Sequence, residues 1–356
     1  MNWVLTALMF ALTSYGIYAI YSATWMRDRD FWSAQIIYAC LGIPVFFAAS
    51  LIDYRWIRLG AVPMYVVGLL ALVAVLLFGE RREGAKRWLD LGFMSFQPSQ
   101  LALIAGVLTL AVYLEASKNS PTPLRLLACG AMVGAPWVLI LLEPDLGSCI
   151  VWVPVLLAMM FVGGIQKRWL FSLIVLGIAM MPIVVYFGLR EYQFRRITTF
   201  LNPDADPLGD GWNINQSLTA IGSGGFHGKG FKAPNTLNEL GFLPSTVVHN
   251  DFIFSVLGEQ HGFVGGIALI SAFALFFLVG FYIAMRANDD LGKTLAVGIV
   301  MLLFTHTFMN IGMTISLTPI TGLPLPFISY GGTFLLISFA CMGLLQSVWV
   351  HRNVTA

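Results

Sequence analysis

The chain has 356 residues, of which 58% are hydrophobic and 11% charged, and its 20 basic and 18 acidic residues give a net charge of +2. Its mean hydropathy is +0.80, whereas soluble domains carry about 25% charged residues. So much apolar surface excludes a cytosolic enzyme and a disordered scaffold, and the near-neutral charge gives no reason to expect a nucleic-acid partner. We therefore predict an integral membrane protein.

Ten stretches are apolar and long enough to cross a bilayer as helices. They are residues 4–23, 33–52, 59–78, 99–117, 126–142, 146–165, 168–188, 262–285, 293–315 and 333–350. They predict an all-α fold in which residues 1–356 form one membrane domain with ten transmembrane helices. The first stretch has no positively charged start and no clear cleavage site, so we expect a retained helix and not a signal peptide.

Two connections are longer than a turn. One is Gly79–Phe96, which begins with GERREGAKRW, and the other is residues 190–261, which contain many embedded apolar and aromatic residues. We interpret the second as a large, partly folded extracytoplasmic loop. With both termini in the cytoplasm, nine Lys and Arg residues lie on that side and six lie in the short connections opposite, as the positive-inside rule favours.

The segment VVHNDFIFSVLGEQHG (247–262) places three polar side chains on one predicted helical face. Asn250 would cap the helix, and Asp251, Ser255 and Glu259 then recur at every fourth position. A carboxylate at the mouth of the bundle beside an apolar run is expected to have a raised pKa, which suits a general base. The alternative is a capping aspartate and a solvated glutamate.

Two further sets carry charge. In Glu143-Pro-Asp145, the acids either orient a cation or basic group, or form a turn in which Asp145 caps the next helix. Arg and Lys side chains also suit a pyrophosphate leaving group, although Arg and Trp are common anchors at membrane interfaces as well. The basic, aromatic and amide residues of this second set are Arg87, Trp88, Gln97, Tyr192, Gln193, Arg195, Arg196, Gln216, Lys229 and Lys232.

Other polar features have simpler interpretations. Asp204 and Asp206 form a DxD between prolines, which is either a turn or a site for a divalent cation such as Mg²⁺ or Mn²⁺. The glycine run Ile221–Phe231 predicts a tight loop or a close approach of backbone to a ligand. His306 is expected to be a hydrogen-bonded core residue, and the four cysteines (Cys40, Cys129, Cys149 and Cys341) small core residues. Pro319, Pro324 and Pro326 predict a re-entrant or outer loop after the ninth helix.

Taken together, several strings resemble the SEDS family of polytopic membrane proteins (RodA, FtsW and SpoVE), and the rod-shape branch RodA more than the division branch FtsW. They are GAKRWLDLGFMSFQPS, EPDLGS, YQFRRITTFLNPDADPLGDGWNINQS, AIGSGGFHGKGF, HNDFIFSVLGEQHGFVG and GLPLPFISYGG, in the order of the family, between residues 84 and 332. The combination is highly specific to this family.

The resemblance implies a peptidoglycan glycosyltransferase of the cytoplasmic membrane, which polymerises lipid II into a growing glycan strand on the outer face for cell elongation and rod shape. It implies a partner transpeptidase, a class B penicillin-binding protein, within the elongation machinery. Asp251 matches the essential aspartate of the family. The reaction requires no organic cofactor, and the sequence leaves a divalent cation open. We expect Arg195, Arg196, Gln216, Lys229, Arg87, Gln97 and Glu259 to bind the substrate.

Two positions depart from the family pattern. Gln100 and Leu103 stand where a glutamate and a lysine are usual, so the intramembrane ion pair of the family cannot form there. Two other functions remain alternatives: a lipid II flippase that uses intramembrane acids, and a non-catalytic scaffold for the transpeptidase. Charges clustered at one face favour the enzyme over the flippase.

Overall fold

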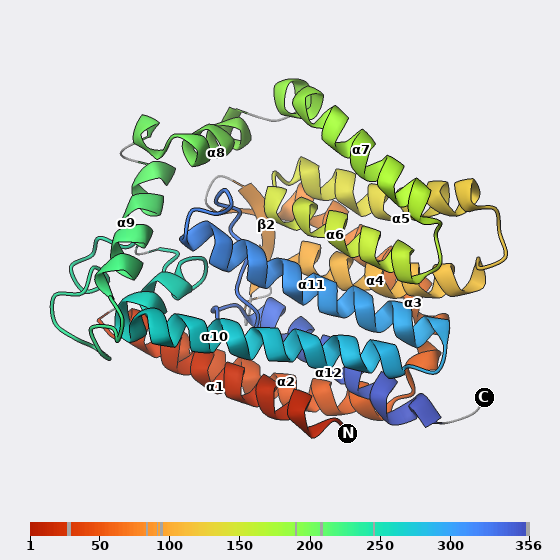
Figure 1. Cartoon of the computed structure of the whole chain (residues 1–356), viewed down its shortest axis with the longest axis horizontal. Coiled ribbons are helices and arrows are strands. Elements are labelled where there is room, and N and C mark those ends of the chain that lie inside the picture. The colour runs from red at the N-terminus through yellow and green to blue at the C-terminus, as the bar shows by residue number, and fades with distance from the viewer. Residues whose placement is uncertain are drawn as a thin grey trace.

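The structure is a computed structural model, and it describes residues 1–26, 30–82, 85–90, 92, 95–188, 191–206, 209–244 and 246–353. Ten helices of this part of the chain overlap the ten predicted spans (Figure 1). They are α1 (Trp3–Thr24), α2 (Phe31–Leu51), α3 (Ile57–Phe78), α4 (Pro98–Ala116), α5 (Thr122–Leu142), α6 (Leu146–Val162), α7 (Lys167–Ile183), α10 (Ile253–Arg286), α11 (Asp290–Thr314) and α12 (Gly332–Val350).

Length and composition make these helices a membrane bundle. Nine helices of the described residues are long and apolar enough to cross a bilayer, and α6 is a shorter apolar helix of 17 residues, which is the lower limit for a span. In α11, 78% of the apolar stretch is buried, against 6% in α7. Helix α11 is therefore central, packed on α4, α6 and α10, while α7 turns nearly all its apolar side chains to the lipid.

The bundle has two distinct ends. Both termini lie at one end, which we call the terminal end, while α8 (Glu191–Leu201), α9 (Asp210–Ser223) and the turns that follow lie at the opposite, loop end (Figure 1). At the terminal end, Arg58 pairs with Glu115 at 2.7 Å. The hydroxyl of Tyr54, in the short helix η1 (Tyr54–Trp56), donates to Asp289 at 2.7 Å.

The connection between α3 and α4 forms a small antiparallel sheet. Strands β1 (Glu80–Arg82), β2 (Ala85–Asp90) and β3 (Ser95–Phe96) pair in the order β1-β2-β3. Residues 83–84, 91 and 93–94 of the predicted connection lie outside the described residues.

The long connection after α7 is folded, and two of its predicted limits need correction. Its predicted start, Arg190, lies outside the described residues, and residues 253–261 belong to α10. Asn250 is not the helix cap, so that prediction is wrong: α10 begins at Ile253 with Phe252 as its N-cap. The reason is local, because the amides of Asn250 and Asp251 both donate to the carbonyl of Val247 in a turn.

The glycine run closes on a kink in α10. Gly262 interrupts the helix with φ +63°, and a Cβ there would lie 2.3 Å from the amide nitrogen of Gly228. Only glycine permits both the positive φ and this approach. The tight-loop interpretation of the run is thus confirmed.

Most of the smaller expectations hold. His306 is buried, with Nδ1 2.9 Å from the carbonyl oxygen of Leu302, which confirms a hydrogen-bonded core residue. Cys129, Cys149 and Cys341 are buried, but Cys40 is exposed. The prediction for Cys40 is wrong because it lies on a surface of α2 that no other described helix covers.

Candidate functional site

The centre of the site is the irregular segment between α11 and α12, residues 315–331, which we call the proline loop. Its hydrophobic residues Leu323, Leu325 and Ile328 are buried. Three hydrogen bonds hold it in place: Asn310 Nδ2 donates to the carbonyl of Leu323 (2.8 Å), Gln35 Nε2 to that of Ser329 (3.1 Å), and the amide of Leu325 to Ser329 Oγ (2.8 Å). Buried polar groups require such partners, and the predicted break after the ninth span is confirmed.

Asp251 lies against this loop. Asn310 Nδ2 donates to its carbonyl oxygen at 3.1 Å, and the hydroxyl of Ser329 donates to that of Asn250 at 2.5 Å. A Cβ at Gly322, where φ is +70°, would lie 3.4 Å from Asp251 Oδ2. The backbone of Asp251 is therefore fixed, while its side chain is only partly buried.

Arg196 reaches the same loop from α8. Its Nη1 donates to the carbonyl of Ile320 at 3.2 Å, two residues before Gly322. Ile320 packs in a small apolar cluster with Ile214 of α9 and Phe252. Helices α8 and α9 thus bring Arg196 to the loop against which Asp251 lies.

Arg195 and Gln216 are the other predicted substrate-binding residues of α8 and α9. Arg195 is exposed, and Gln216 is half-buried on α9. The neighbour of Gln216, Ser217, is buried and fixes α9 through its hydroxyl, which lies 2.6 Å from Ser255 Oγ and 2.6 Å from the carbonyl of Thr314. The side chain of Tyr192 lies outside the described residues.

Both interpretations of the Glu143-Pro-Asp145 segment, a helix cap and a partner for a basic group, are confirmed. Asp145 caps α6, because its Oδ1 accepts from the amide of Ser148 at 3.2 Å. Asp145 also orients a basic group: Arg87 Nη1 lies 3.8 Å from Oδ1, and Gln97 Nε2 donates to Oδ2 at 3.4 Å. The two predicted substrate-binding residues Arg87 and Gln97 therefore converge on one carboxylate.

The proline loop joins this group to Asp251. A Cβ at Gly147, just after Asp145, would lie 2.6 Å from the carbonyl oxygen of Thr321, and Thr321 precedes Gly322. Sequence-distant residues thus form one site at the loop end of the bundle. The group of Arg87, Gln97 and Asp145 adjoins the loop at Thr321 through Gly147, while Arg196 and Asp251 meet it at Ile320 and Gly322.

Glu143 is a buried acid beside this site. It has 0% exposure, and neither carboxylate oxygen has a hydrogen-bond partner among the described residues. Burial, and to a smaller extent the negative charge of Asp145, raise the pKa of Glu143 to about 9. The positive charge of Arg87 lowers this pKa but does not outweigh them. Glu143 is therefore neutral at physiological pH.

Glu259 and Lys229 lie together, away from the proline loop. Lys229 Nζ and the amide of Leu237 both donate to Glu259 Oε1 at 2.7 Å, and Glu259 is buried. The interpretation of Glu259 as a solvated residue is wrong, because Glu259 is buried and holds the glycine run, through Lys229, and the segment after it, through Leu237, to α10. A substrate role for either residue stays a prediction.

Several polar residues of the site were not predicted. Asn310 and Gln35 hold the proline loop, and both lie inside predicted apolar spans. A polar side chain at membrane depth is the signal that would have found them. Gln100 and Leu103, the two departures from the family pattern, are both buried in α4.

The structure supports the turn at the DxD sequence. Pro203–Ala205 form the short helix η3, and the amide of Asp206 donates to the carbonyl of Pro203. Within the described ranges, no group of three His, Cys, Asp or Glu residues could hold a metal ion.

Comparison with known proteins places this site in context. Residues 2–354 match the family model FTSW_RODA_SPOVE, whose description is cell cycle protein. The peptidoglycan glycosyltransferase MrdB of Escherichia coli K12 is 36% identical over 98% of this chain and 93% of its own length. The peptidoglycan glycosyltransferase RodA of Treponema pallidum is 32% identical, over 98% and 97%.

Solved structures share the fold over the whole chain. A chain from a peptidoglycan synthase complex, solved to describe the structural coordination of polymerization and crosslinking, superposes with a TM-score of 0.85 at 28% identity and covers 99% of both chains. The rod shape determining protein RodA of Thermus thermophilus superposes with a TM-score of 0.74 at 26% identity and covers 99% of this chain and 98% of its own.

Proposed function

Because the chain belongs to the FtsW/RodA/SpoVE family of cell cycle proteins, we propose that it is a peptidoglycan glycosyltransferase. It polymerises lipid II into glycan strands at the outer face of the cytoplasmic membrane, for cell elongation and rod shape. The names of its relatives support this activity. A polar site at one end of an apolar bundle also suits a substrate that has a sugar head and a lipid tail.

The reaction is a single displacement with inversion. A hydroxyl oxygen of the acceptor sugar attacks the anomeric carbon of the donor, its proton passes to a base, and the bond from that carbon to the pyrophosphate breaks. The pyrophosphate leaves with the bonding electrons and gains negative charge. A positioned carboxylate and nearby cations therefore stabilise the transition state.

One observation carries the assignment of roles: the carboxylate of Asp251 and the guanidinium of Arg196 meet the same four-residue stretch, 319–322, of the proline loop. We assign Asp251 as the general base and Arg196 as a ligand of the departing pyrophosphate. Arg87 and Gln97, held by Asp145, are assigned to the substrate as well. The lipid pyrophosphate is already activated, so no organic cofactor is needed.

A class B penicillin-binding protein is the proposed partner, because strands made here must be crosslinked elsewhere. The structurally similar chain from a peptidoglycan synthase complex supports such an assembly. We place the pair in the elongation machinery. No nucleic acid takes part.

The test is polymerisation of fluorescent lipid II by the purified protein, alone and with its transpeptidase. Asp251→Asn keeps the shape of the side chain and removes its basicity, so we expect a loss of about 10²–10⁴-fold. Asp251→Glu moves the carboxylate oxygen by about 1 Å, and we expect the rate of polymerisation to fall by about 10²-fold. Asp30→Asn is the matched control, because Asp30 is exposed and its side chain caps no helix.

Other outcomes would identify other functions. Translocation of lipid II across vesicles without polymer would support the flippase, and neither activity would support the scaffold. Near wild-type polymerisation by Asp251→Asn would move the base elsewhere, with Glu259 as the next candidate. Repeating the assay with EDTA, Mg²⁺ or Mn²⁺ tests for a metal ion.

A further inference from the structure

A groove between α1 and α2 opens on the surface of the bundle near its loop end. Its volume is about 340 Å³, and Ser14, Ile17, Tyr18, Tyr21, Trp32 and Ile36 line it. From Ser14 to Tyr21 the groove follows seven residues of α1, which is about 10 Å along a helix. That is less than half the thickness of a hydrocarbon core of about 30 Å, so the groove lies within one leaflet.

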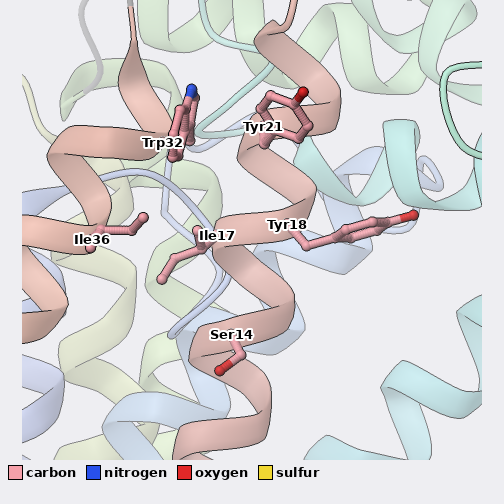
Figure 2. A pocket seen from close by; sticks show the side chains of 6 residues that line it. All are labelled: Ser14, Ile17, Tyr18, Tyr21, Trp32 and Ile36. Atoms are coloured by element: carbon pink, nitrogen blue, oxygen red, sulfur yellow. The ribbon is translucent and has the colours of Figure 1, made fainter.

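The groove is apolar along its middle, with the hydroxyl of Ser14 at one end and the polar groups of Tyr21 and Trp32 at the other, which we call the polar end. Figure 2 shows Ile17 and Ile36 facing each other across its middle, while the hydroxyl of Tyr21 and the indole nitrogen of Trp32 point toward the same end. The two rings pack edge to face with centroids 5.5 Å apart. An apolar channel that ends in polar groups matches the division of a lipid into chain and head group.

Lys232 adds a positive charge at the polar end. Its Nζ donates to the hydroxyl of Tyr21 at 2.7 Å and lies 4.8 Å from the ring centroid of Trp25. Because the Tyr21 oxygen accepts this bond, its own proton is directed to another acceptor. The Trp32 N–H and the Lys232 ammonium are donors only. The end of the groove thus offers donors and a cation, which are complementary to an anion.

The local charge selects the kind of anion. No carboxylate of the described residues lies within ion-pairing distance of Lys232, and no acid lines the groove. Lys229, three residues away, is already paired with Glu259 at 2.7 Å. Among the described residues Lys232 has no carboxylate partner, and its single positive charge balances the single negative charge of a phosphodiester better than the charge of a pyrophosphate.

We propose that this groove binds an anionic phospholipid of the leaflet at the loop end. One acyl chain lies between α1 and α2, and the phosphodiester accepts hydrogen bonds from Lys232, Tyr21 and Trp32. Because Lys232 belongs to the segment that follows the glycine run, the lipid fastens that segment to the first two helices. The site is independent of the proposed glycosyltransferase activity.

The experiment compares lipids with identical chains on the full-length protein in detergent. Bound dioleoylphosphatidylglycerol and dioleoylphosphatidylcholine are counted by native mass spectrometry, and melting temperatures are measured with each. We expect about tenfold stronger binding of phosphatidylglycerol and a rise in melting temperature with that lipid alone, because the choline cation of phosphatidylcholine offsets the attraction between its phosphodiester and Lys232.

Four variants separate the groove from general surface charge. Lys232→Gln is expected to reduce phosphatidylglycerol binding to the level of phosphatidylcholine. Ile36→Trp fills the groove at a lipid-facing position, leaves the polar end intact, and is expected to have the same effect. Lys167→Gln removes one positive charge at the terminal end and is expected to leave binding unchanged. Tyr21→Phe keeps the ring and loses one hydrogen-bond donor, so a partial loss of phosphatidylglycerol binding is expected. This conservative variant keeps the test valid if another variant folds poorly.

Three results would overturn the proposal. They are equal binding of the two lipids, unchanged binding by both Lys232→Gln and Ile36→Trp, and displacement of phosphatidylglycerol by an equimolar amount of undecaprenyl diphosphate. The last would assign the groove to the substrate. Because each readout is binding or melting temperature, the result does not depend on whether the protein polymerises lipid II.

Discussion

Arg195 and Arg196 are adjacent in sequence but differ in their surroundings. Arg196 donates to the carbonyl of Ile320, while Arg195 is exposed. We expect Arg196→Ala to reduce the rate of lipid II polymerisation by about 10–100-fold, since hydrogen bonds to charged groups contribute about 1.5–3 kcal/mol. Arg196→Lys is expected to lose much of the activity too, because lysine lacks the planar fork of arginine.

The neighbouring position supplies the control for this prediction. Arg195→Ala removes the same charge from the same helix without a contact to the proline loop, so a smaller loss is expected. Initial rates on fluorescent lipid II, with melting temperatures as a check on folding, measure both variants. Equal activity of Arg196→Ala and the unmodified protein would remove Arg196 from the site.

The buried carboxyl of Glu143 predicts a pH dependence of stability. Its folded-state pKa of about 9 lies above the ordinary glutamate value of about 4.3. The contribution of Glu143 to the free energy of unfolding is therefore fully present below about pH 4.3 and is lost as pH rises toward 9. The free energy of unfolding falls by at most about 1.4 kcal/mol per pH unit in this range. Glu143→Gln does not titrate, so its stability should exceed that of the unmodified protein increasingly as pH rises.

Melting temperatures in detergent at about pH 5, 6.5 and 8 measure the difference. The exposed residue Glu191 supplies the control Glu191→Gln, for which a small and constant difference is expected. A gap between Glu143→Gln and the unmodified protein that does not change with pH would show that Glu143 does not titrate in this range.

The sequence predicts some single residues of the site and not others. The place of Asp251 next to an apolar run could be predicted, because its string is a local feature, while its role as the base stays a prediction. The contact of Arg196 with Ile320 could not, because 124 positions separate the two residues and no periodicity reports such a distance. Asn310 was overlooked because its apolar neighbours dominate the hydropathy of its span.

At the scale of secondary-structure elements, the attachment of the glycine run to α10 depends on the ion pair between Lys229 and the buried Glu259. Lys229→Met would leave Glu259 charged and unpaired, and its side chain is 1% exposed. We expect a decrease of about 3–5 kcal/mol in the free energy of unfolding. The double variant with Glu259→Gln should recover part of this loss, because it removes the stranded charge.

A double-mutant cycle on thermal stability measures this coupling. Polymerase assays on the same variants separate a structural from a substrate role. Unchanged stability with lost polymerisation in Lys229→Met would assign the lysine to the substrate and contradict its role as a fastener.

The helices themselves were predicted well, and their ends less well. Runs of about 20 apolar residues have few alternatives in a bilayer, so all ten spans appear as helices. The start of α10 was predicted two residues too early, at Asp251. The Asn250-Asp251 pair matches a capping pattern, but both amides donate back to the carbonyl of Val247 in a local turn.

At the scale of the whole molecule, the orientation of the two ends is the remaining prediction. The terminal end carries nine Lys and Arg residues in short connections, against six at the loop end outside the long connection. Since such basic residues are retained in the cytoplasm, we expect the loop end, with Asp251 and the proline loop, to face outward. A polymerase that extends strands outside the membrane requires this orientation.

Single cysteines at the two ends test the orientation in intact cells. Cys40 is first replaced by alanine because it is exposed, whereas the other three cysteines are buried. Leu240 is 55% exposed near Asn235 in the long connection, and it is preferred because Asn235 has φ +62°, which would strain a substitution. Leu240→Cys should react with a membrane-impermeant maleimide in intact cells. Asn119→Cys, exposed between α4 and α5, should react only after permeabilisation. The reverse pattern would place Asp251 in the cytoplasm, where lipid II polymerisation on the outer face could not use it.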